Sequence, residues 1–271
     1  MTGAPVHDGE QVRPMGATAP RVPLLAMKQI TKRFNAVEAL VGVDFEVYAH
    51  EVVALVGDNG AGKSTLAQIV SGVLTPDSGI IELAGEPATI PNPSAAHAAG
   101  IATVFQDLAL CDNLDVTANL FLGREATAGG SFLRDGEMEQ TTKRILRDLN
   151  SPIPSVKTQL HALSGGQRQS VAIARTLIGN PRIVVLDEPT AALSVAQTAE
   201  VLTLIERLRE LGLGVILISH NMVDVRAVSD RIEVLRHGRN NGSFDATTAS
   251  YESILAAITG ATSYIKGDRA Y

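Results

Sequence analysis

One glycine-rich segment constrains this chain more than any other, because residues 57–64 read Gly-Asp-Asn-Gly-Ala-Gly-Lys-Ser. The run matches the pattern G-x-x-x-x-G-K-[ST], whose glycines let the backbone turn tightly and approach a polyphosphate. Residues 51–56 before it form an apolar run of strand length, and residues 65–70 after it carry apolar side chains at helical spacing. The alternative is a glycine-rich turn before an ordinary helix. The flanking strand and helix favour a site for a nucleoside triphosphate.

Each part of this segment, the phosphate loop, has a predicted contact with the nucleotide. Backbone N–H groups and the amino end of the following helix present partial positive charge to phosphates. Lys63 adds a full charge directed at the β- and γ-phosphates, and the Ser64 hydroxyl suits Mg²⁺. Thr65 either joins these contacts or only begins the helix. The predicted contacts are Gly57, Asp58, Asn59, Gly60, Ala61, Gly62, Lys63, Ser64 and Thr65.

Composition limits the fold and the compartment. The 271 residues are 45% hydrophobic but contain no tryptophan and only 4% aromatics, so the core must consist of Val, Ile, Leu and Ala, as in a buried parallel sheet. A net charge of −6 argues against a nucleic-acid partner. The single cysteine, Cys111, excludes an internal disulfide and favours a reducing compartment. We interpret it as a buried or incidental thiol rather than a nucleophile.

Neither a membrane span nor a secretion signal is predicted. No apolar run approaches the roughly 18 residues that a membrane helix needs. Residues 1–23 lack the apolar centre of a signal peptide and are interpreted as a flexible tail.

Strand and helix patterns alternate at both ends of the chain, which indicates a parallel sheet with crossover helices. The middle, about residues 107–178, is mostly helical in pattern and is predicted to be an inserted helical subdomain. The best-supported helix, 195–211, begins with a capping box of Ser194 and Gln197 and is followed by Gly212. Strands are expected at 24–30, 43–48, 51–56, 79–83, 101–105, 182–187, 214–219 and 231–236. Helices are expected at 63–73, 94–98, 114–122, 136–149, 165–179, 195–211, 221–228 and 250–259.

Two acids follow the apolar strand 183–186 and suit phosphate chemistry. The carboxyl end of a buried parallel strand is where ligands bind in such folds. Asp187 suits coordination of Mg²⁺, and Glu188 suits orienting or deprotonating an attacking water. A solvated turn is the alternative for these acids by themselves. The phosphate loop makes the chemical interpretation the stronger one.

A second anion-binding end is indicated at residues 163–167, Leu-Ser-Gly-Gly-Gln. Ser164 can cap the helix that follows, and Gly165 and Gly166 leave its amino end open to an anion. An ordinary capped helix is the alternative. With the phosphate loop and the acidic pair, the pentapeptide resembles the signature motif of the nucleotide-binding subunits of ATP-binding cassette (ABC) transporters.

This resemblance covers about residues 24–259 and implies a fold and an assembly. The fold is the α/β core of P-loop NTPases, a mixed sheet with flanking helices, together with an antiparallel β subdomain and the helical subdomain. Residues 1–23 and 260–271 would be tails. Two copies would form a head-to-tail dimer that holds each ATP between one copy's phosphate loop and the signature residues of the other, Ser164, Gly165, Gly166 and Gln167.

The resemblance also assigns roles to other residues. Phe34 stands where the family stacks an aromatic ring on adenine, and a core phenylalanine is the less favoured alternative. Gln106 matches a glutamine that contacts Mg²⁺ and links the core to the helical subdomain. His220, at a strand end where a histidine is usually structural, matches a switch that reaches the γ-phosphate. Catalysis would then rest on Glu188, His220 and Lys63, and the metal on Ser64, Gln106 and Asp187.

One segment departs from the family pattern. Many members have an aspartate closing a Ser-Ala-Leu-Asp run after the acidic pair, whereas residues 191–194 here read Ala-Ala-Leu-Ser. The departure puts in doubt the contact which that loop makes across the dimer, but not metal binding or hydrolysis.

Finer features resemble importers of simple sugars. They lie in residues 109–116, 119–125, 219–222 and 234–239. The resemblance implies a homodimer, or a pair with a paralogous cassette, on the cytoplasmic face of the inner membrane. Multi-span permease subunits and, indirectly, a periplasmic sugar-binding protein would be its partners. The alternatives are an exporter motor or a soluble ABC ATPase of an assembly or maintenance system; chromosome-type members need long heptad arms that this chain lacks.

Overall fold

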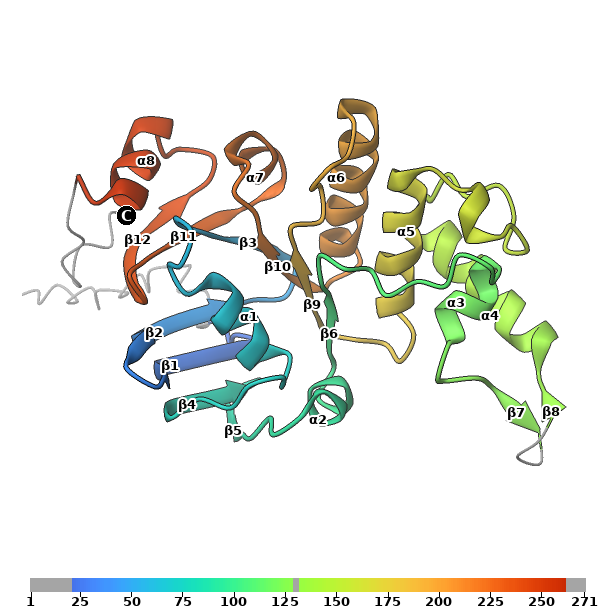
Figure 1. Ribbon diagram of the computed structural model, residues 1–271, viewed down its shortest axis with the longest axis horizontal. Helices are drawn as coiled ribbons and strands as arrows, with labels where there is room; N and C mark the ends of the chain where they lie inside the picture. The colour runs from blue at the N-terminus through green and yellow to red at the C-terminus, as the bar shows by residue number, and fades with distance from the viewer. Residues whose placement is uncertain (1–20, 129–131, 262–271) are drawn as a thin grey trace, which may run out of the picture.

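The structure is a computed structural model that describes residues 21–128 and 132–261. It contains a six-stranded sheet, a four-stranded sheet and helices that cover both (Figure 1). Most of the two expected tails, residues 1–20 and 262–271, lies outside the described residues. The expected α/β class, with a mixed sheet, flanking helices, an antiparallel sheet and inserted helices, is confirmed.

The six-stranded sheet has the order β12-β11-β3-β10-β9-β6 and is parallel except for β12, which runs antiparallel to β11. All of its parallel strands were expected from the apolar runs. β12 was not expected, because its sequence, Arg-Asn-Asn-Gly-Ser-Phe-Asp, is polar and lies at the sheet edge. The strands are β3 (Glu51–Val56), β6 (Ile101–Val104), β9 (Ile183–Asp187), β10 (Gly214–Ile218), β11 (Arg231–Arg236) and β12 (Arg239–Asp245).

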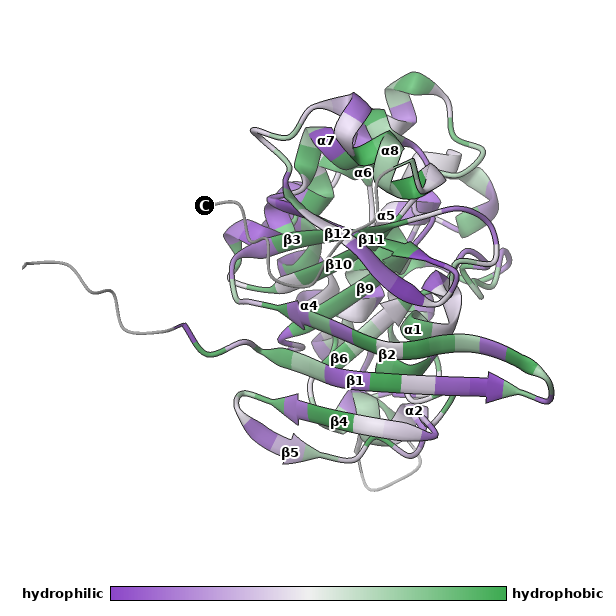
Figure 2. Ribbon diagram, turned by 90° about the vertical axis from the view of Figure 1, so that its left-hand side faces the viewer, coloured by the Kyte–Doolittle hydropathy of each residue, from purple (hydrophilic) through white to green (hydrophobic). Residues whose placement is uncertain are grey.

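Both faces of this sheet are buried, so its central strands are apolar throughout. Successive side chains of a strand point to opposite faces. Val184 and Leu186 of β9 therefore pack into one core, with the helices α3 to α6, and Val185 packs into a second core with α1 and the antiparallel sheet. Figure 2 shows these strands as the hydrophobic centre of the molecule.

The second sheet is antiparallel, with the order β2-β1-β4-β5. The alternation at the amino-terminal end had indicated parallel strands, and that inference is wrong here. Two-residue turns at 35–36 and 84–85 connect β1 to β2 and β4 to β5 without a crossover helix, and the chain between β2 and β4 forms β3 and α1. Asn35, Ala84 and Gly85 have positive φ, as such turns require. The strands are β1 (Leu25–Phe34), β2 (Val37–Val47), β4 (Ser78–Leu83) and β5 (Glu86–Ala88).

Eight α-helices lie within the described residues, close to the expected positions. Those expected to reach residues 73 and 179 end earlier, and Gly72 and Gly179, just beyond them, have positive φ. The capping box of Ser194 and Gln197 is confirmed. The helices are α1 (Lys63–Val70), α2 (Pro93–Ala98), α3 (Val116–Phe121), α4 (Asp135–Asp148), α5 (Gly165–Thr176), α6 (Val195–Glu210), α7 (Met222–Val228) and α8 (Tyr251–Thr259).

The residues between β6 and β9, here called the helical segment, contain α3, α4 and α5 and extend to the right in Figure 1. A 3₁₀ turn at Leu160–Ala162 and a short pairing of β7 (Thr127–Ala128) with β8 (Phe132–Leu133) complete it. The side chains of this segment form one continuous core with one face of the six-stranded sheet. The helices are therefore fixed to the strands by shared apolar contact.

Candidate functional site

The register of the parallel strands brings the predicted site residues to one edge. Leu55 of β3 pairs with Ile218 of β10, and Ile218 pairs with Asp187 of β9. The phosphate loop, the acidic pair and His220 therefore leave the sheet at the same level. This edge is the carboxyl end of the parallel strands, where ligands bind in such folds.

Crowding by neighbouring backbone fixes the shape of the phosphate loop. A Cβ at Gly57 would lie 2.2 Å from the carbonyl oxygen of Leu235, and one at Gly62 would lie 2.6 Å from that of Ala39. Both glycines also have positive φ, 151° and 105°. No other residue type fits either position without moving the backbone.

A glycine that sequence reasoning did not assign supports the same loop. The Gly238 N–H, in the turn between β11 and β12, donates to Ala61 O at 3.0 Å, and Gly238 O accepts from Val41 N–H at 2.8 Å. A Cβ at Gly238 would lie 2.7 Å from Ala39 O. Its φ is positive, 73°, and the sequence signal that could have identified it is a glycine in a short polar turn between two strands.

Helix α1 begins within the loop and keeps its amino end open. Its N-cap is Gly62 in a left-handed conformation, and no side chain of the described residues caps it. Ser64 is exposed there, and Thr65 is half-buried. In the preceding turn Asp58, Asn59 and Gly60 are exposed and Ala61 is buried. The uncapped N–H groups and the helix dipole together favour an anion at this end.

Lys63 is folded back over the loop. Its Nζ donates to the carbonyl oxygens of Gly57 at 2.8 Å and Asp58 at 2.9 Å, and the residue is only 9% exposed. Burial lowers the pKa of the Lys63 ammonium, while the nearby carboxylates of Glu188, Asp58 and Asp187 act in the opposite direction. These two bonds hold the Lys63 ammonium group over the loop.

The two acids differ in their surroundings. Burial raises the pKa of the Asp187 carboxyl and the charge of Glu188 raises it further, while Lys63 lowers it. Glu188 has a φ of 50°, rare for a residue with a side chain, and its N–H donates to Ile218 O at 2.9 Å. Its Oε1 lies 2.8 Å from His220 Nδ1. The side chain of His220 is 75% exposed, so this contact orients the imidazole more than packing does.

Two further predicted residues lie on exposed segments. Phe34, at the end of β1, is 42% exposed and therefore not part of the core, and Lys32 Nζ lies 5.9 Å from its ring centroid. Gln106 is exposed just beyond β6. The residues that follow Gln106 are bound by Arg175 of α5, which donates to Leu108 O at 2.7 Å and to Ala109 O at 2.8 Å. The segment of Gln106 is thereby joined to the helix that Ser164 begins.

The signature residues lie apart from this group. Ser164 caps α5 in a capping box, since its Oγ accepts from Gln167 N–H at 3.2 Å and its N–H donates to Gln167 Oε1 at 3.0 Å. Gly165 and Gly166 pack against the start of α6, at Leu193 and Gln197. Figure 1 shows α1 and α5 on opposite sides of β6. One chain thus assembles the loop, Asp187, Glu188 and His220, and leaves residues 164–167 facing elsewhere.

Comparison with known proteins decides what this arrangement is. A family model described as ABC transporter matches residues 40–191, more than half of the chain. The chain belongs to the ABC transporter family. The loop, the acidic pair and the signature residues all lie within the matched region, and His220 lies 29 residues beyond its end.

Curated relatives of this ABC transporter chain are import proteins. It is 44% identical to a xylose/arabinose import ATP-binding protein of Sulfolobus acidocaldarius, over 80% of this chain and 86% of that one. It is 41% identical to a fructose import ATP-binding protein of Rhizobium meliloti, over 88% and 95%. A ribose import ATP-binding protein of Yersinia pestis is 42% identical over 89% of this chain, which spans only 47% of that protein's length.

Solved structures show the same fold. A nucleotide-free ATP-binding cassette from an ABC transporter superposes with a TM-score of 0.76 at 25% identity, covering 88% of this chain and 95% of that one. A dimeric ATP-binding cassette in a post-hydrolysis state, bound to ADP and Pi, superposes with a TM-score of 0.67 at 26% identity, covering 82% and 98%. This chain is an ABC-type ATPase that binds nucleotide.

The residue that departs from the ABC transporter pattern has a structural role here. Ser194 is the N-cap of α6, and its Oγ accepts from Gln197 N–H at 3.5 Å. Serine and aspartate are both good N-cap residues, so the change keeps the start of α6 while removing a charge.

The described residues contain neither a cluster of metal ligands nor a membrane-spanning helix. In residues 21–128 and 132–261, no three His, Cys, Asp or Glu side chains gather as a ready-made metal site. Among the same residues, no helix combines the length and the apolarity that crossing a bilayer requires.

Proposed function

We propose that this chain is the ATP-hydrolysing subunit of a membrane importer for a monosaccharide. The observation that carries the proposal is the meeting of Lys63, Asp187, Glu188 and His220 at one sheet edge, in a chain more than 40% identical to xylose/arabinose and fructose import ATP-binding proteins. An exporter motor and a soluble assembly ATPase remain the alternatives, and the import proteins among the relatives favour import.

The proposed hydrolysis uses charges that the fold already holds. The phosphate loop and Lys63 bind the β- and γ-phosphates, and Phe34 stacks on adenine. Glu188 orients an attacking water and accepts its proton, and His220, held by Glu188, donates to the γ-phosphate. The open amino end of α1 stabilises the phosphate charge.

The residues also suit Mg²⁺. Ser64 offers a hydroxyl, Asp187 a carboxylate and Gln106 an amide oxygen, which are the oxygen ligands that Mg²⁺ prefers. Mg²⁺ is commonly bound by one or two carboxylates together with substrate phosphates, so no larger acidic cluster is needed. When bound, the ion would neutralise charge on the β- and γ-phosphates. We propose that these three residues hold it.

We further propose a head-to-tail dimer and a division of the chain. Residues 164–167 lie apart from the phosphate loop of their own chain, so a second copy, identical or paralogous, would place its signature residues over that loop. The dimeric cassette among the similar structures supports this assembly. The ATPase domain would extend over residues 24–259, with the helical subdomain at about 107–178.

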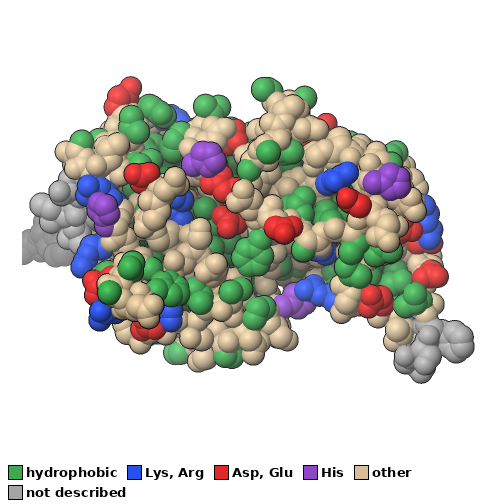
Figure 3. All heavy atoms as spheres, in the orientation of Figure 1, with side chains coloured by type: hydrophobic (Ala, Val, Ile, Leu, Met, Phe, Trp, Pro, Cys, Tyr) green, Lys and Arg blue, Asp and Glu red, His purple; other side chains and the backbone are tan. Residues whose placement is uncertain are grey.

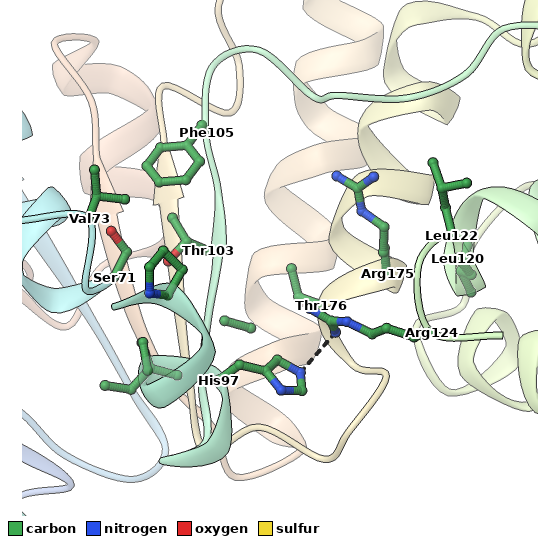
Figure 4. Close-up of a pocket in the computed structure, with 14 residues that line it drawn as sticks. Ser71, Val73, His97, Thr103, Phe105, Leu120, Leu122, Arg124, Arg175 and Thr176 are labelled. Atoms are coloured by element: carbon green, nitrogen blue, oxygen red, sulfur yellow. Dashed lines mark hydrogen bonds between the residues drawn. The ribbon is translucent and has the colours of Figure 1, made fainter. Parts of the chain in front are cut away.

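A groove between the two halves of the molecule suits the permease. A hollow of about 270 Å³ lies between the sheet edge and the helical segment. Exposed apolar side chains of Val73, Phe105 and Leu122 line it, and Arg124, which contacts His97 at 2.8 Å, gives it positive charge (Figures 3 and 4). We propose that a cytoplasmic permease segment with apolar and acidic side chains docks here, which would place the cassette on the cytoplasmic face of the inner membrane.

The first experiment tests the chemistry. Glu188→Gln is expected to bind ATP and dimerise but to hydrolyse it on the order of 100-fold more slowly, because the amide cannot accept the proton. Single-turnover hydrolysis and gel filtration with ATP measure both properties. Near-full turnover would exclude Glu188 as the base.

The second experiment tests the partner. The tagged chain should co-purify from membranes with a multi-span permease, and a sugar-binding protein should stimulate its ATPase activity in vesicles. Leu122→Glu, which adds an acid to the groove lining, should weaken the co-purification, while the similarly exposed Leu133→Glu should not. A purely soluble set of partners would refute the importer.

A further inference from the structure

A buried carboxylate close to the site has no part in the proposed chemistry. Asp224, in the first turn of α7, is only 5% exposed. Its Oδ2 accepts a hydrogen bond from the Thr190 hydroxyl at 2.7 Å. An acid in the first turn often serves its own helix, but Asn221 already caps α7 by accepting from Val223 N–H at 3.0 Å. The Asp224 carboxylate instead reaches across to a different segment.

The two segments that this bond joins are those that carry the proposed chemistry. Thr190 lies two residues after Glu188, and Asp224 lies four residues after His220. The 2.8 Å contact of Glu188 with His220 joins the same two segments at the sheet edge. They are thus linked twice, once through the exposed His220 and once through the buried Asp224.

The contact between Glu188 and His220 depends on backbone placement, because the histidine has little packing of its own. The side chain of His220 is 75% exposed, whereas that of Glu188 is 17% exposed. Glu188 also has a backbone conformation that residues with a side chain rarely adopt. The Asp224 carboxylate is only 5% exposed, and a hydrogen bond to a carboxylate there is stronger than in water.

We propose that Asp224 and Thr190 form a latch that positions Glu188 against His220 for ATP hydrolysis. Asp224 is a positioning residue, since it acts through the chain segments and not on the nucleotide. With the latch open, the start of α7 and residues 188–190 shift relative to each other, and the distance between the glutamate and the histidine varies. Nucleotide binding depends on the phosphate loop and is left unchanged.

The test opens the latch without changing residue size. In the full-length chain, Thr190→Val should lower kcat for ATP hydrolysis by roughly tenfold to 100-fold, the cost of a small misplacement, and leave KM for ATP within about twofold. Thr190→Ser keeps the hydroxyl and should retain most of kcat. Asp224→Ala should lower kcat about as much as Thr190→Val does. The double variant should have a kcat no lower than that of the less active single variant, because both changes remove the same bond.

A matched control separates positioning from stability. Thr142 is a fully buried threonine of α4 whose hydroxyl donates to Met138 O at 2.9 Å, so Thr142→Val removes a comparable bond far from the site. It should lower the melting temperature about as much as Thr190→Val and leave kcat unchanged. Unchanged kcat in Thr190→Val, or equal losses in Thr190→Ser and Thr190→Val, would overturn the latch. If Thr190→Val does not fold, Asp224→Ala, which removes the acceptor of the same bond, replaces it with the same kcat and KM measurements.

Discussion

Two helices of this cassette begin at glycines that suit an anion, and their amino ends are built in opposite ways. At α1 the N-cap is Gly62, no side chain in the described part of the chain caps the helix, and the backbone of neighbouring strands fixes the turn. At α5 the N-cap is Ser164, which forms a complete capping box with Gln167. The N–H groups at the first end have no side-chain acceptor within the described residues, whereas the second end is capped by Ser164.

This difference indicates what each end contributes. The end of α1 is preorganised by backbone contacts and surrounded by charge, so it is suited to hold a phosphate within a single chain. The end of α5 is stable alone and exposes Ser164 and Gly165, so it is suited to reach a nucleotide that another copy presents. We infer that the first end provides most of the affinity and the second provides the condition for hydrolysis.

The largest effect should come from blocking the end of α1. Gly62→Ala places a Cβ 2.6 Å from Ala39 O in a left-handed backbone, so the loop has to move. ATP hydrolysis should fall by about 100-fold or more, together with nucleotide affinity. Gly136→Ala, in α4 with open space around it, is the matched control and should leave both unchanged. Retained nucleotide affinity in Gly62→Ala would show that backbone crowding does not shape this end.

A smaller effect should separate the two roles of Ser164. Ser164→Asp preserves the cap, so the melting temperature should hold, but it adds a negative charge where the partner's γ-phosphate is proposed to lie. Hydrolysis should fall on the order of tenfold or more. Ser164→Ala, by contrast, should also lower the melting temperature, because loss of a cap costs roughly 1 kcal/mol. If Ser164→Asp kept full hydrolysis, α5 would be a capped helix only.

The smallest effect concerns the charge around α1. Burial and Glu188 raise the pKa of Asp187, so its ionised form is disfavoured in the empty cassette. Asp187→Asn should therefore raise the melting temperature without nucleotide by a few degrees, on the order of 2–4 °C at pH 7–8.

The pH dependence of that difference follows from the direction of the shift. The folded chain binds a proton at Asp187 more readily than the unfolded chain does, so wild-type stability gains from this group as the pH falls through the folded-state pKa. The higher melting temperature of Asp187→Asn should therefore shrink as the pH falls through the folded-state pKa of Asp187. Above that pKa the difference from wild type should be full. Melting curves of both proteins from pH 4 to 8 measure it. If the difference in melting temperature between the two proteins stayed constant over this pH range, the raised pKa of Asp187 would be contradicted.

Sequence patterns predicted the parallel core well, because a strand buried on both faces must be apolar throughout. The runs at 51–56, 182–187 and 214–219 correspond to β3, β9 and β10 within a residue. Patterns could not show β12, whose polar residues sit at an edge, or the true length of β1, where register shifts between Met27 and Ile30 interrupt the alternation.

Sequence patterns predicted the phosphate loop but not the contacts between distant residues of the site, for a similar reason. Glycine spacing identified the phosphate loop, since the constraint is local. The contact of Glu188 with His220 and that of Thr190 with Asp224 join residues more than thirty positions apart. Only the sheet register brings such pairs together, and no local pattern encodes it.

The left-handed backbone of Glu188 has a consequence for protein engineering. A φ of 50° suits glycine or asparagine better than glutamate, so a selection for heat resistance alone would favour those residues at position 188. On the proposed mechanism, each such variant would lose the group that accepts the water's proton. A library designed to stabilise this cassette should therefore hold position 188 constant, because there thermostability and turnover select for different amino acids.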